Sequence, residues 1–293
     1  IKSLEKNIDT EFMKEQIFSI SKQIRDSFEI IEENKFDLYK SKFNNIVICG
    51  MGGSAVSGDF VKMILLNELK IPIIVNRSYN LPGYVSNDSL VIISSYSGNT
   101  EETISCYKEA VDLDSSILCL CAGGIIEEIS SIDNNLCLKI PTGYHPRAAI
   151  GYSLSLILLF LNKINLCSDL IIKELDESRL SLDNFINNIN EYLPNIIDYA
   201  KIITKTFPII YGSNYFGFAI ASRFRSQLAE NSKILSSTYE FPEQNHNDLE
   251  GYVKGANTDI SIFWIHTNMD HERNQLRMRL VNEIIDDKVV SQI

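Results

Sequence analysis

Residues 90–107, LVIISSYSGNTEETISCY, constrain the fold more than any other stretch of the chain. The branched apolar run at 90–93 is typical of a buried strand, and a helix is expected after the loop that follows. That loop carries three small hydroxyl side chains and one glycine. Asn99 and Glu102 have the spacing of a capping box, which predicts where the helix begins.

The hydroxyls of this loop, Ser95, Ser97 and Thr100, are candidates for holding an anion. The start of a helix exposes backbone N–H groups and the positive end of the helix dipole, and both favour a phosphate. Two interpretations stay open at this point: a phosphate-binding loop, or a serine-rich loop that only caps a helix. Glu101 and Glu102 weigh against an anion unless their side chains point away from the loop.

Strands and helices alternate through the first half of the chain. Short apolar or β-branched runs predict strands at residues 45–49, 71–76, 90–94, 117–121 and 137–140. An amphipathic helix or helix pair is expected before them, within residues 1–43. This alternation predicts an α/β fold in which a mostly parallel sheet is flanked by helices.

The second half of the chain repeats this plan. Its expected elements are a strand at 208–213 entering a glycine turn, a helix to residue 229, a strand-like run at 234–237, a strong strand at 259–266 and a helix at 273–285. No counterpart of the hydroxyl-rich loop follows the strong strand. We therefore predict two tandem domains, residues 1–165 and residues 166–293, of which only the first retains the anion loop.

A glycine-rich turn, GMGGS at residues 50–54, follows the first strand. A strand, a glycine turn and a helix suggest a dinucleotide site, but the spacing fits that fingerprint poorly and no clear acidic residue follows the second strand. A more general interpretation is that glycines let the backbone approach a ligand and that a hydroxyl helps to bind it. Gly53 and Ser54 are therefore candidate binding residues.

The charge and the apolar runs exclude some classes of partner. The net charge is −11, whereas binding to nucleic acid needs clustered Lys and Arg, so we expect no nucleic-acid partner. The apolar run at 148–164 is shorter than the ~20 residues that span a bilayer, so we expect no membrane partner. This run predicts a helix buried in the core or at a subunit interface.

The six cysteines include no CxxC pair, and no signal peptide is recognisable. Both observations favour a reducing, cytoplasmic location. Because His and Cys do not cluster at metal-ligand spacing, we expect no metal site.

Three residues are candidates for chemistry. Arg147 is expected in the first turn of the apolar helix, where a cation opposes the dipole unless it binds an anion. Glu230 is expected near a helix C-terminus, where the dipole disfavours the ionised form and suits a general base. His246 lies in a polar loop and is an acid–base candidate. The alternative is a solvated surface side chain, which for Glu230 and His246 is the more common case.

Taken together, these motifs resemble those of the bifunctional phosphoglucose/phosphomannose isomerases, in which two sugar-isomerase (SIS) domains form one subunit. The resemblance runs from about residue 40 to the last residue. The segments that carry it are GMGGS at 50–54, SYSGNTEET at 95–103, HPRAA at 145–149, AEN at 229–231 and FPEQNHND at 241–248. The SGNT loop marks the wider SIS superfamily, whereas the PRAA and EN…HND segments are more specific.

The resemblance implies an aldose–ketose isomerase that interconverts glucose 6-phosphate, and also mannose 6-phosphate, with fructose 6-phosphate through a cis-enediolate. It implies that Ser95, Ser97 and Thr100 hold the phosphate and that Gly53 and Ser54 line the sugar end.

For the chemistry, the resemblance implies that Glu230 moves the proton between C1 and C2 and that Arg147 stabilises the enediolate oxyanion. It implies that His246, supplied by the partner subunit, assists ring opening. A homodimer is therefore expected, with a sugar phosphate as substrate and without a cofactor.

The sequence departs from this family at its C-terminus. Relatives carry a catalytic lysine in a C-terminal segment, and this sequence stops before it, with Lys288 preceding the place where that segment would begin; either the sequence is truncated or the protein has lost full activity. A non-catalytic sugar-phosphate sensor is therefore an alternative function. An amino-sugar phosphate isomerase is a third hypothesis, although no partner for a 2-amino group is recognisable.

Overall fold

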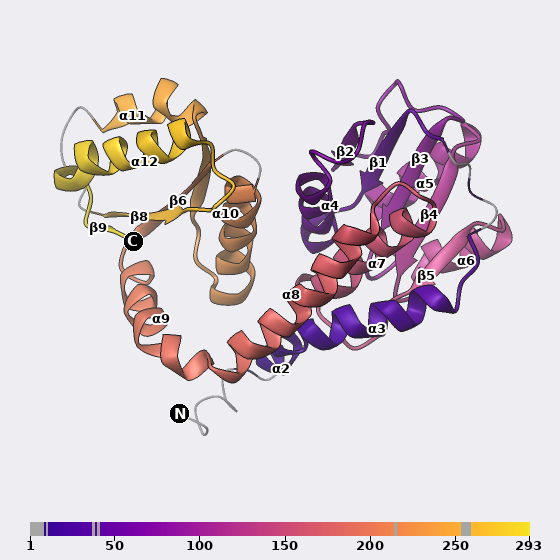
Figure 1. The fold of residues 1–293 in the computed structure, drawn as a ribbon, viewed down its shortest axis with the longest axis horizontal. Helices are drawn as coiled ribbons and strands as arrows, with labels where there is room; N and C mark the ends of the chain where they lie inside the picture. The colour runs from indigo at the N-terminus through magenta and orange to yellow at the C-terminus, as the bar shows by residue number, and fades with distance from the viewer. Residues whose placement is uncertain (1–8, 10, 37–38, 40–41, 214–215, 253–258) are drawn as a thin grey trace. The chain divides into compact units, whose positions relative to one another are not determined.

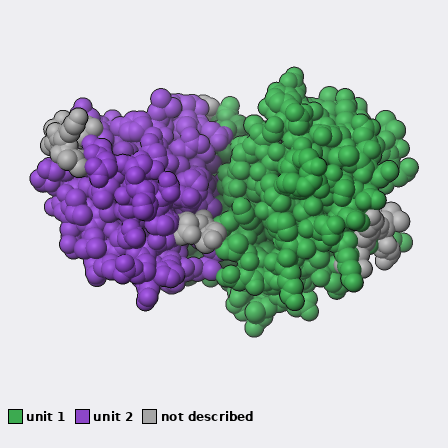
Figure 2. All heavy atoms as spheres, turned by 90° about the horizontal axis from the view of Figure 1, so that it is seen from above, with its two compact units in different colours: residues 1–187 green, residues 188–293 purple. Residues whose placement is uncertain are grey.

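The computed structural model describes residues 9, 11–36, 39, 42–213, 216–252 and 259–293. The chain forms two compact units, residues 1–187 and residues 188–293, and each is described by itself (Figure 2). Part of the predicted N-terminal helical region, residues 1–8, lies outside the described residues.

The first unit is built on a parallel five-stranded sheet (Figure 1). Its strands are β1 (Asn45–Cys49), β2 (Ile73–Asn76), β3 (Ser89–Ser94), β4 (Ser116–Cys121) and β5 (Leu136–Lys139). Their order across the sheet is β2-β1-β3-β4-β5, and every pairing is parallel. The α/β prediction and all five predicted strands are confirmed, with boundaries that differ by a few residues.

Helices cover both faces of this sheet, as expected for parallel strands. They are α2 (Met13–Phe18), α3 (Ile20–Glu32), α4 (Gly52–Ile64), α5 (Glu101–Asp112), α6 (Gly124–Ile132), the short turn η1 (Pro146–Ala148), α7 (Ile150–Lys163) and α8 (Asp169–Asn187). Alternate residues of β1 belong to different cores. Ile46 and Ile48 pack with α3, α4 and α7, whereas Val47 and Cys49 pack with α5 and α6.

The order of these strands creates a switch point between β1 and β3. The chain leaves β1 through α4 on one face of the sheet and leaves β3 through α5 on the other face. Loops at the carboxyl ends of such neighbouring strands diverge and leave a crevice, which is the usual ligand site of open α/β sheets. The GMGGS turn follows β1 and the SYSGNT loop follows β3, so both candidate binding motifs lie at this point.

Helix α7 forms the centre of one core. Eleven of its residues are buried, among them Tyr152, Leu156 and Phe160. The apolar run therefore stabilises the first unit itself, and the prediction of a helix buried in the core is confirmed. Within the predicted amphipathic N-terminal region, Ile24 and Ile31 are buried as expected, whereas Phe12 and Ile17 are exposed.

The helix α8 packs against α3 and α7. It therefore belongs to the first compact unit, whereas the sequence favours placing residues 166–187 with the second domain.

The second unit repeats the arrangement with a smaller parallel sheet in the order β7-β6-β8-β9. Its elements are α9 (Ile189–Ile203), β6 (Phe207–Ser213), α10 (Phe216–Gln227), η2 (Leu228–Ser232), β7 (Ser237–Phe241), η3 (Glu243–His246), α11 (Asp248–Gly251), β8 (Ile260–Ile265), α12 (Glu272–Ile285), η4 (Asp286–Lys288) and β9 (Ser291–Gln292). The order β7-β6-β8 matches β2-β1-β3 of the first sheet.

Two boundaries in this unit differ from the sequence prediction. The strand expected at 234–237 begins only at Ser237, and the short strand β9 was not expected. β9 is found by pairing, because Trp264 and Ile293 share a backbone hydrogen bond and Ile262 pairs with Gln292. A two-residue strand has no periodicity of its own that a sequence pattern could reveal.

Within the described ranges, none of the helices is both long enough and apolar enough to cross a membrane.

Candidate active site

The SYSGNT loop folds back on itself between β3 and α5. Ser95 is buried, and its hydroxyl donates to Thr100 Oγ1 at 3.0 Å. The amide of Asn99 donates to Ser97 Oγ at 3.2 Å, and Thr103 Oγ1 donates to the Thr100 carbonyl at 2.8 Å. The three hydroxyls singled out by the sequence are thus drawn into one tight turn directly before a helix.

The capping box predicted at this helix is wrong. The N-cap is Thr100, one residue later than expected, and no side-chain capping bond forms at it among the described residues. Asn99 Oδ1 instead accepts a hydrogen bond from the amide of Ile125 at 3.1 Å. The start of α5 is therefore free of a competing side-chain cap, which suits a site for an external anion.

The segment 122–126, which joins β4 to the first turn of α6, supports the SYSGNT loop. Tyr96 O and Gly98 O accept from the amides of Ala122 and Ile126 at 2.8 and 3.0 Å. Gly98 has φ +67°, and a Cβ there would lie 1.8 Å from the carbonyl oxygen of Gly123. Only glycine fits this contact, because a side chain would meet backbone rather than a movable group.

The GMGGS turn brings the backbone of the first sheet against the segment that carries Arg147. A Cβ on Gly53 would lie 2.9 Å from the carbonyl oxygen of Pro146 and 3.1 Å from Cα of Arg147. Ser54 follows in the first turn of α4 and is buried. Because Gly53 has no side chain, the backbone of residues 146 and 147 can pack closely against it.

Arg147 lies in the 3-10 turn η1 and is half-buried. Its predicted place in the first turn of the apolar helix is wrong, because α7 begins only at Ile150. The turn forms because Pro146 occupies its first position, where the missing N–H costs nothing.

Tyr96 connects the phosphate-loop candidate to the same segment. Its hydroxyl accepts from the amide of Tyr144 at 2.8 Å and donates to the carbonyl of Pro141 at 2.9 Å. Burial raises the pKa of Tyr96, which keeps this hydroxyl protonated and able to donate. Sequence reasoning missed this residue; the only signal was one large aromatic side chain among small polar residues.

Glu230 lies in the second unit, in the π-helical turn η2 that continues α10. The predicted helix end is therefore replaced by a wider turn, which closes at Lys233 with φ +58°. Arg223, on α10, is the residue of this region that sequence reasoning missed. Burial lowers the pKa of Arg223, while the charge of Glu230 acts in the opposite direction, so the two side chains interact electrostatically.

His246 closes the 3-10 turn η3, directly after β7. It lies at the opposite end of this sheet from Glu230. Because β6 and β7 are parallel, the connection α10–η2 begins at the carboxyl edge and must end at the amino edge, where Glu230 lies. η3 follows the carboxyl end of β7, so the topology keeps Glu230 and His246 apart within one unit.

The structure therefore brings together the binding candidates and Arg147 in the first unit, and it places Glu230 and His246 on the second. In the part of the chain that is described, no three His, Cys, Asp or Glu side chains gather as a metal site would require.

Models of two protein families match the chain. The SIS domain model matches residues 37–163, and the model of the bacterial phospho-glucose isomerase C-terminal SIS domain matches residues 197–293. The protein is thus a tandem SIS-domain protein, in agreement with the two parallel sheets and with the hydroxyl-rich loop at the switch point of the first.

Relatives define the family more closely. The bifunctional phosphoglucose/phosphomannose isomerase of Caldicellulosiruptor bescii is 34% identical over 93% of this chain and 82% of its own length. That of Aquifex aeolicus is 30% identical, with the same shares covered. This chain belongs to the bifunctional phosphoglucose/phosphomannose isomerase family and is an aldose–ketose isomerase by class.

Solved structures agree in fold. The tagatose-6-phosphate ketose/aldose isomerase of Escherichia coli has a TM-score of 0.69 over 96% of this chain and 79% of its own, at 15% identity.

Proposed function

We propose that this chain interconverts glucose 6-phosphate, and also mannose 6-phosphate, with fructose 6-phosphate through a cis-enediolate. The observation that carries the proposal is the meeting of the hydroxyl-rich loop, the GMGGS turn and the Arg147 segment at the switch point of the first sheet. The names of the relatives supply the substrates.

The phosphate is held by the hydroxyls of Ser95, Ser97 and Thr100 together with the backbone N–H groups at the start of α5. A chain with net charge −11 needs such local donors, since its overall field repels an anion. Gly53 and Ser54 line the sugar end. Binding energy from the phosphate places C1 and C2 of the sugar for reaction.

Glu230 acts as the base that removes the proton from C2 of the aldose and returns it to C1, while a proton passes from O2 to O1, which gives the ketose. Arg147 stabilises the negative charge that develops on the oxygens of the enediolate. The proton moves within one molecule and no electrons leave it, so the proposal includes no cofactor.

His246 assists ring opening and is supplied by the partner chain of a homodimer. The separation of Glu230 and His246 across the second sheet supports this part of the proposal, because one chain cannot bring both to the same sugar from a single unit. The helix α9 has exposed apolar side chains, including Tyr192, Ile196 and Ile197, that a partner chain would cover.

We infer a cytoplasmic location from the substrate class and from the six cysteines, all of which are free thiols.

The test measures how fast the Glu230→Gln variant turns over fructose 6-phosphate in a coupled assay. Loss of the base is expected to lower kcat by about 10²–10⁴-fold, with binding of a polyol phosphate unchanged. The control is Glu283→Gln, which removes an exposed carboxylate from α12. Turnover of Glu230→Gln at the rate of the control would overturn the assignment.

A further inference from the structure

Two glutamines of the N-terminal helices hold the segment that carries Arg147. Gln16 Oε1, on α2, accepts from the amide of His145 at 2.7 Å. Gln23 Nε2, on α3, donates to the carbonyl of Ala148 at 2.8 Å. These two bonds lie immediately before and after the dipeptide Pro146-Arg147, so they fix the backbone on both sides of it.

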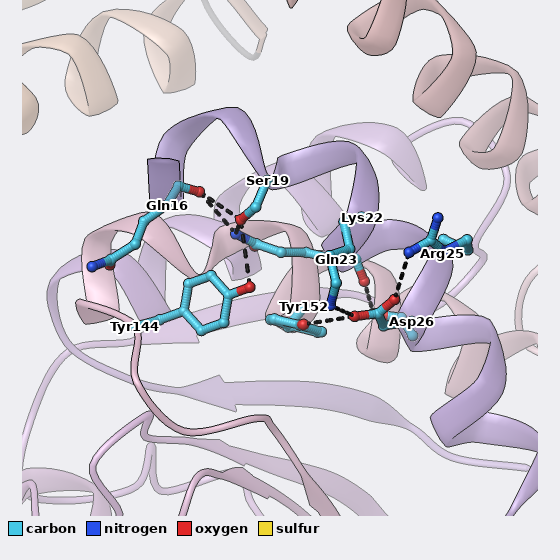
Figure 3. Close-up of polar contacts among 9 residues, drawn as sticks. Gln16, Ser19, Lys22, Gln23, Arg25, Asp26, Tyr144 and Tyr152 are labelled. Carbon is cyan, nitrogen blue, oxygen red and sulfur yellow. Dashed lines mark hydrogen bonds and ion pairs between the residues drawn. The ribbon is translucent and has the colours of Figure 1, made fainter. Parts of the chain in front are cut away.

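The amide of Gln23 is fully buried, and its surroundings determine its orientation. Nε2 also donates to Ser19 Oγ at 3.1 Å and to the Gln16 carbonyl at 3.4 Å (Figure 3). Oε1 points toward α7, where a Cβ on Gly151 would come within 2.7 Å of it. Two of the neighbours of Nε2 are carbonyl oxygens, which can only accept, so this position needs a donor.

A buried amide in a helix contact costs free energy unless its polar atoms are hydrogen-bonded, and here Nε2 is bonded whereas Oε1 has no partner among the described residues. An apolar side chain would serve packing between α3 and α7 better. We infer that the role of this amide, beyond packing, is the hydrogen bond from Nε2 to the carbonyl of Ala148.

Other groups restrain the segment from different directions. Gly53 packs against Pro146 and Arg147 on the side of the ligand turn, and the Tyr96 hydroxyl bonds the amide of Tyr144. The ring of Tyr144 stacks edge-to-face on Tyr152 with centroids 5.5 Å apart.

Tyr152, which contacts Tyr144, is in turn hydrogen-bonded to α3. Tyr152 donates to Asp26 Oδ2 at 3.0 Å, and Asp26 pairs with Lys22 (Figure 3).

We propose that Gln16 and Gln23 are positioning residues for Arg147. They set the backbone from which its guanidinium reaches the enediolate oxygens, and the proposal rests on the role of Arg147 in the proposed function. Misplacement of a catalytic group by ~1 Å lowers the rate about 100-fold, because charge stabilisation depends on geometry. The phosphate loop is held by different residues, so substrate affinity should change little.

The test uses Gln23→Met, which keeps the length of the side chain and removes the donor. The expected result is a kcat about 10–100-fold lower with KM within about threefold of the wild type. The control is Ser27→Ala on the same buried face of α3, whose hydroxyl, within the described part of the chain, donates to the Gln23 carbonyl of its own helix. An equal kcat for both variants would overturn the proposal.

Coupling to Arg147 separates positioning from a general loss of structure. In an Arg147→Ala background, Gln23→Met is expected to cause no further loss of kcat, because the group that it positions is absent. The same fold-loss in both backgrounds would contradict the proposal.

Gln16 provides a second route if Gln23→Met does not fold. Gln16 is only half-buried. Gln16→Met removes the acceptor of the His145 amide and should lower kcat, whereas Gln16→Glu retains an acceptor oxygen and should restore it. Failure of Gln16→Glu to exceed Gln16→Met in kcat would overturn the role of this bond.

A binding measurement distinguishes failure of this inference from failure of the proposed function. A sugar-phosphate hydroxamate mimics the planar enediolate anion, whereas a polyol phosphate offers only the phosphate. Wild type should bind the hydroxamate more tightly, and Gln23→Met should lose most of this preference. No preference in wild type would refute the proposed function; a preference unchanged in Gln23→Met would refute the positioning role alone.

Discussion

Replacement of Gly98 by alanine tests whether the hydroxyl-rich loop after β3, the proposed phosphate site, depends on the segment after β4. The added Cβ would lie 1.8 Å from the Gly123 carbonyl oxygen, well inside contact distance, so the two loops must separate. Separation would break up to three bonds between the loops, Ala122 N to Tyr96 O, Ile126 N to Gly98 O and Ile125 N to Asn99 Oδ1.

The cost follows from two contributions. Alanine at φ +67° costs about 1–2 kcal/mol relative to glycine. Three hydrogen bonds contribute about 1 kcal/mol each, which adds about 3 kcal/mol. Gly98→Ala is thus expected to destabilise the first unit by about 4–5 kcal/mol. Gly143→Ala is the matched control, because Gly143 has φ +92° but open space around its Cβ position, so only the backbone contribution applies.

The assay must report on the first unit. The single tryptophan, Trp264, lies in β8 of the second unit, so its fluorescence does not serve. Hydrogen exchange followed by mass spectrometry on peptides covering 95–103 and 122–128 reports the loops directly. Protection lost in Gly98→Ala and kept in Gly143→Ala, together with a higher KM for Gly98→Ala, is the expected result. Equal protection in the two variants would refute the reasoning.

Two further predictions concern charge. Burial lowers the pKa of Arg223 and the charge of Glu230 acts against this, so Arg223→Met should remove a charge partner of Glu230 and lower kcat/KM, whereas the exposed Arg225→Met should leave it unchanged; equal kcat/KM for the two variants would contradict the interaction. For Asp26, burial acts to raise the pKa, but the hydrogen bonds from Lys22 and Tyr152 outweigh it and lower the pKa. A lowered carboxylate pKa stabilises the fold above the ordinary value of about 4, and this contribution is lost as the pH falls through the lowered pKa. The Tm difference between wild type and Asp26→Asn should therefore be present at pH 7 and vanish in acid, and a difference that persists in acid would contradict this assignment.

Much of the fold can be predicted from local patterns. The five strands of the first sheet are short apolar runs, and burial of parallel strands on both faces is what makes such runs continuous. The hydroxyl loop and the GMGGS turn are recognisable because their composition differs from that of strand and helix. The errors at Asn99, Arg147 and residues 234–237 are boundary errors, since a cap or a strand end depends on partners outside the local window.

What the sequence by itself determined is the class of fold, the two repeated halves and the candidate residues for binding and chemistry. The tertiary structure alone decided the strand order β2-β1-β3-β4-β5, which places the turn after β1 beside the loop after β3. It also decided which distant residues hold the Arg147 segment: Gln16 and Gln23 bond residues more than 100 positions away. No local pattern encodes such pairs, because hydrogen bonds across a fold depend on how the elements pack, and packing depends on the chain as a whole.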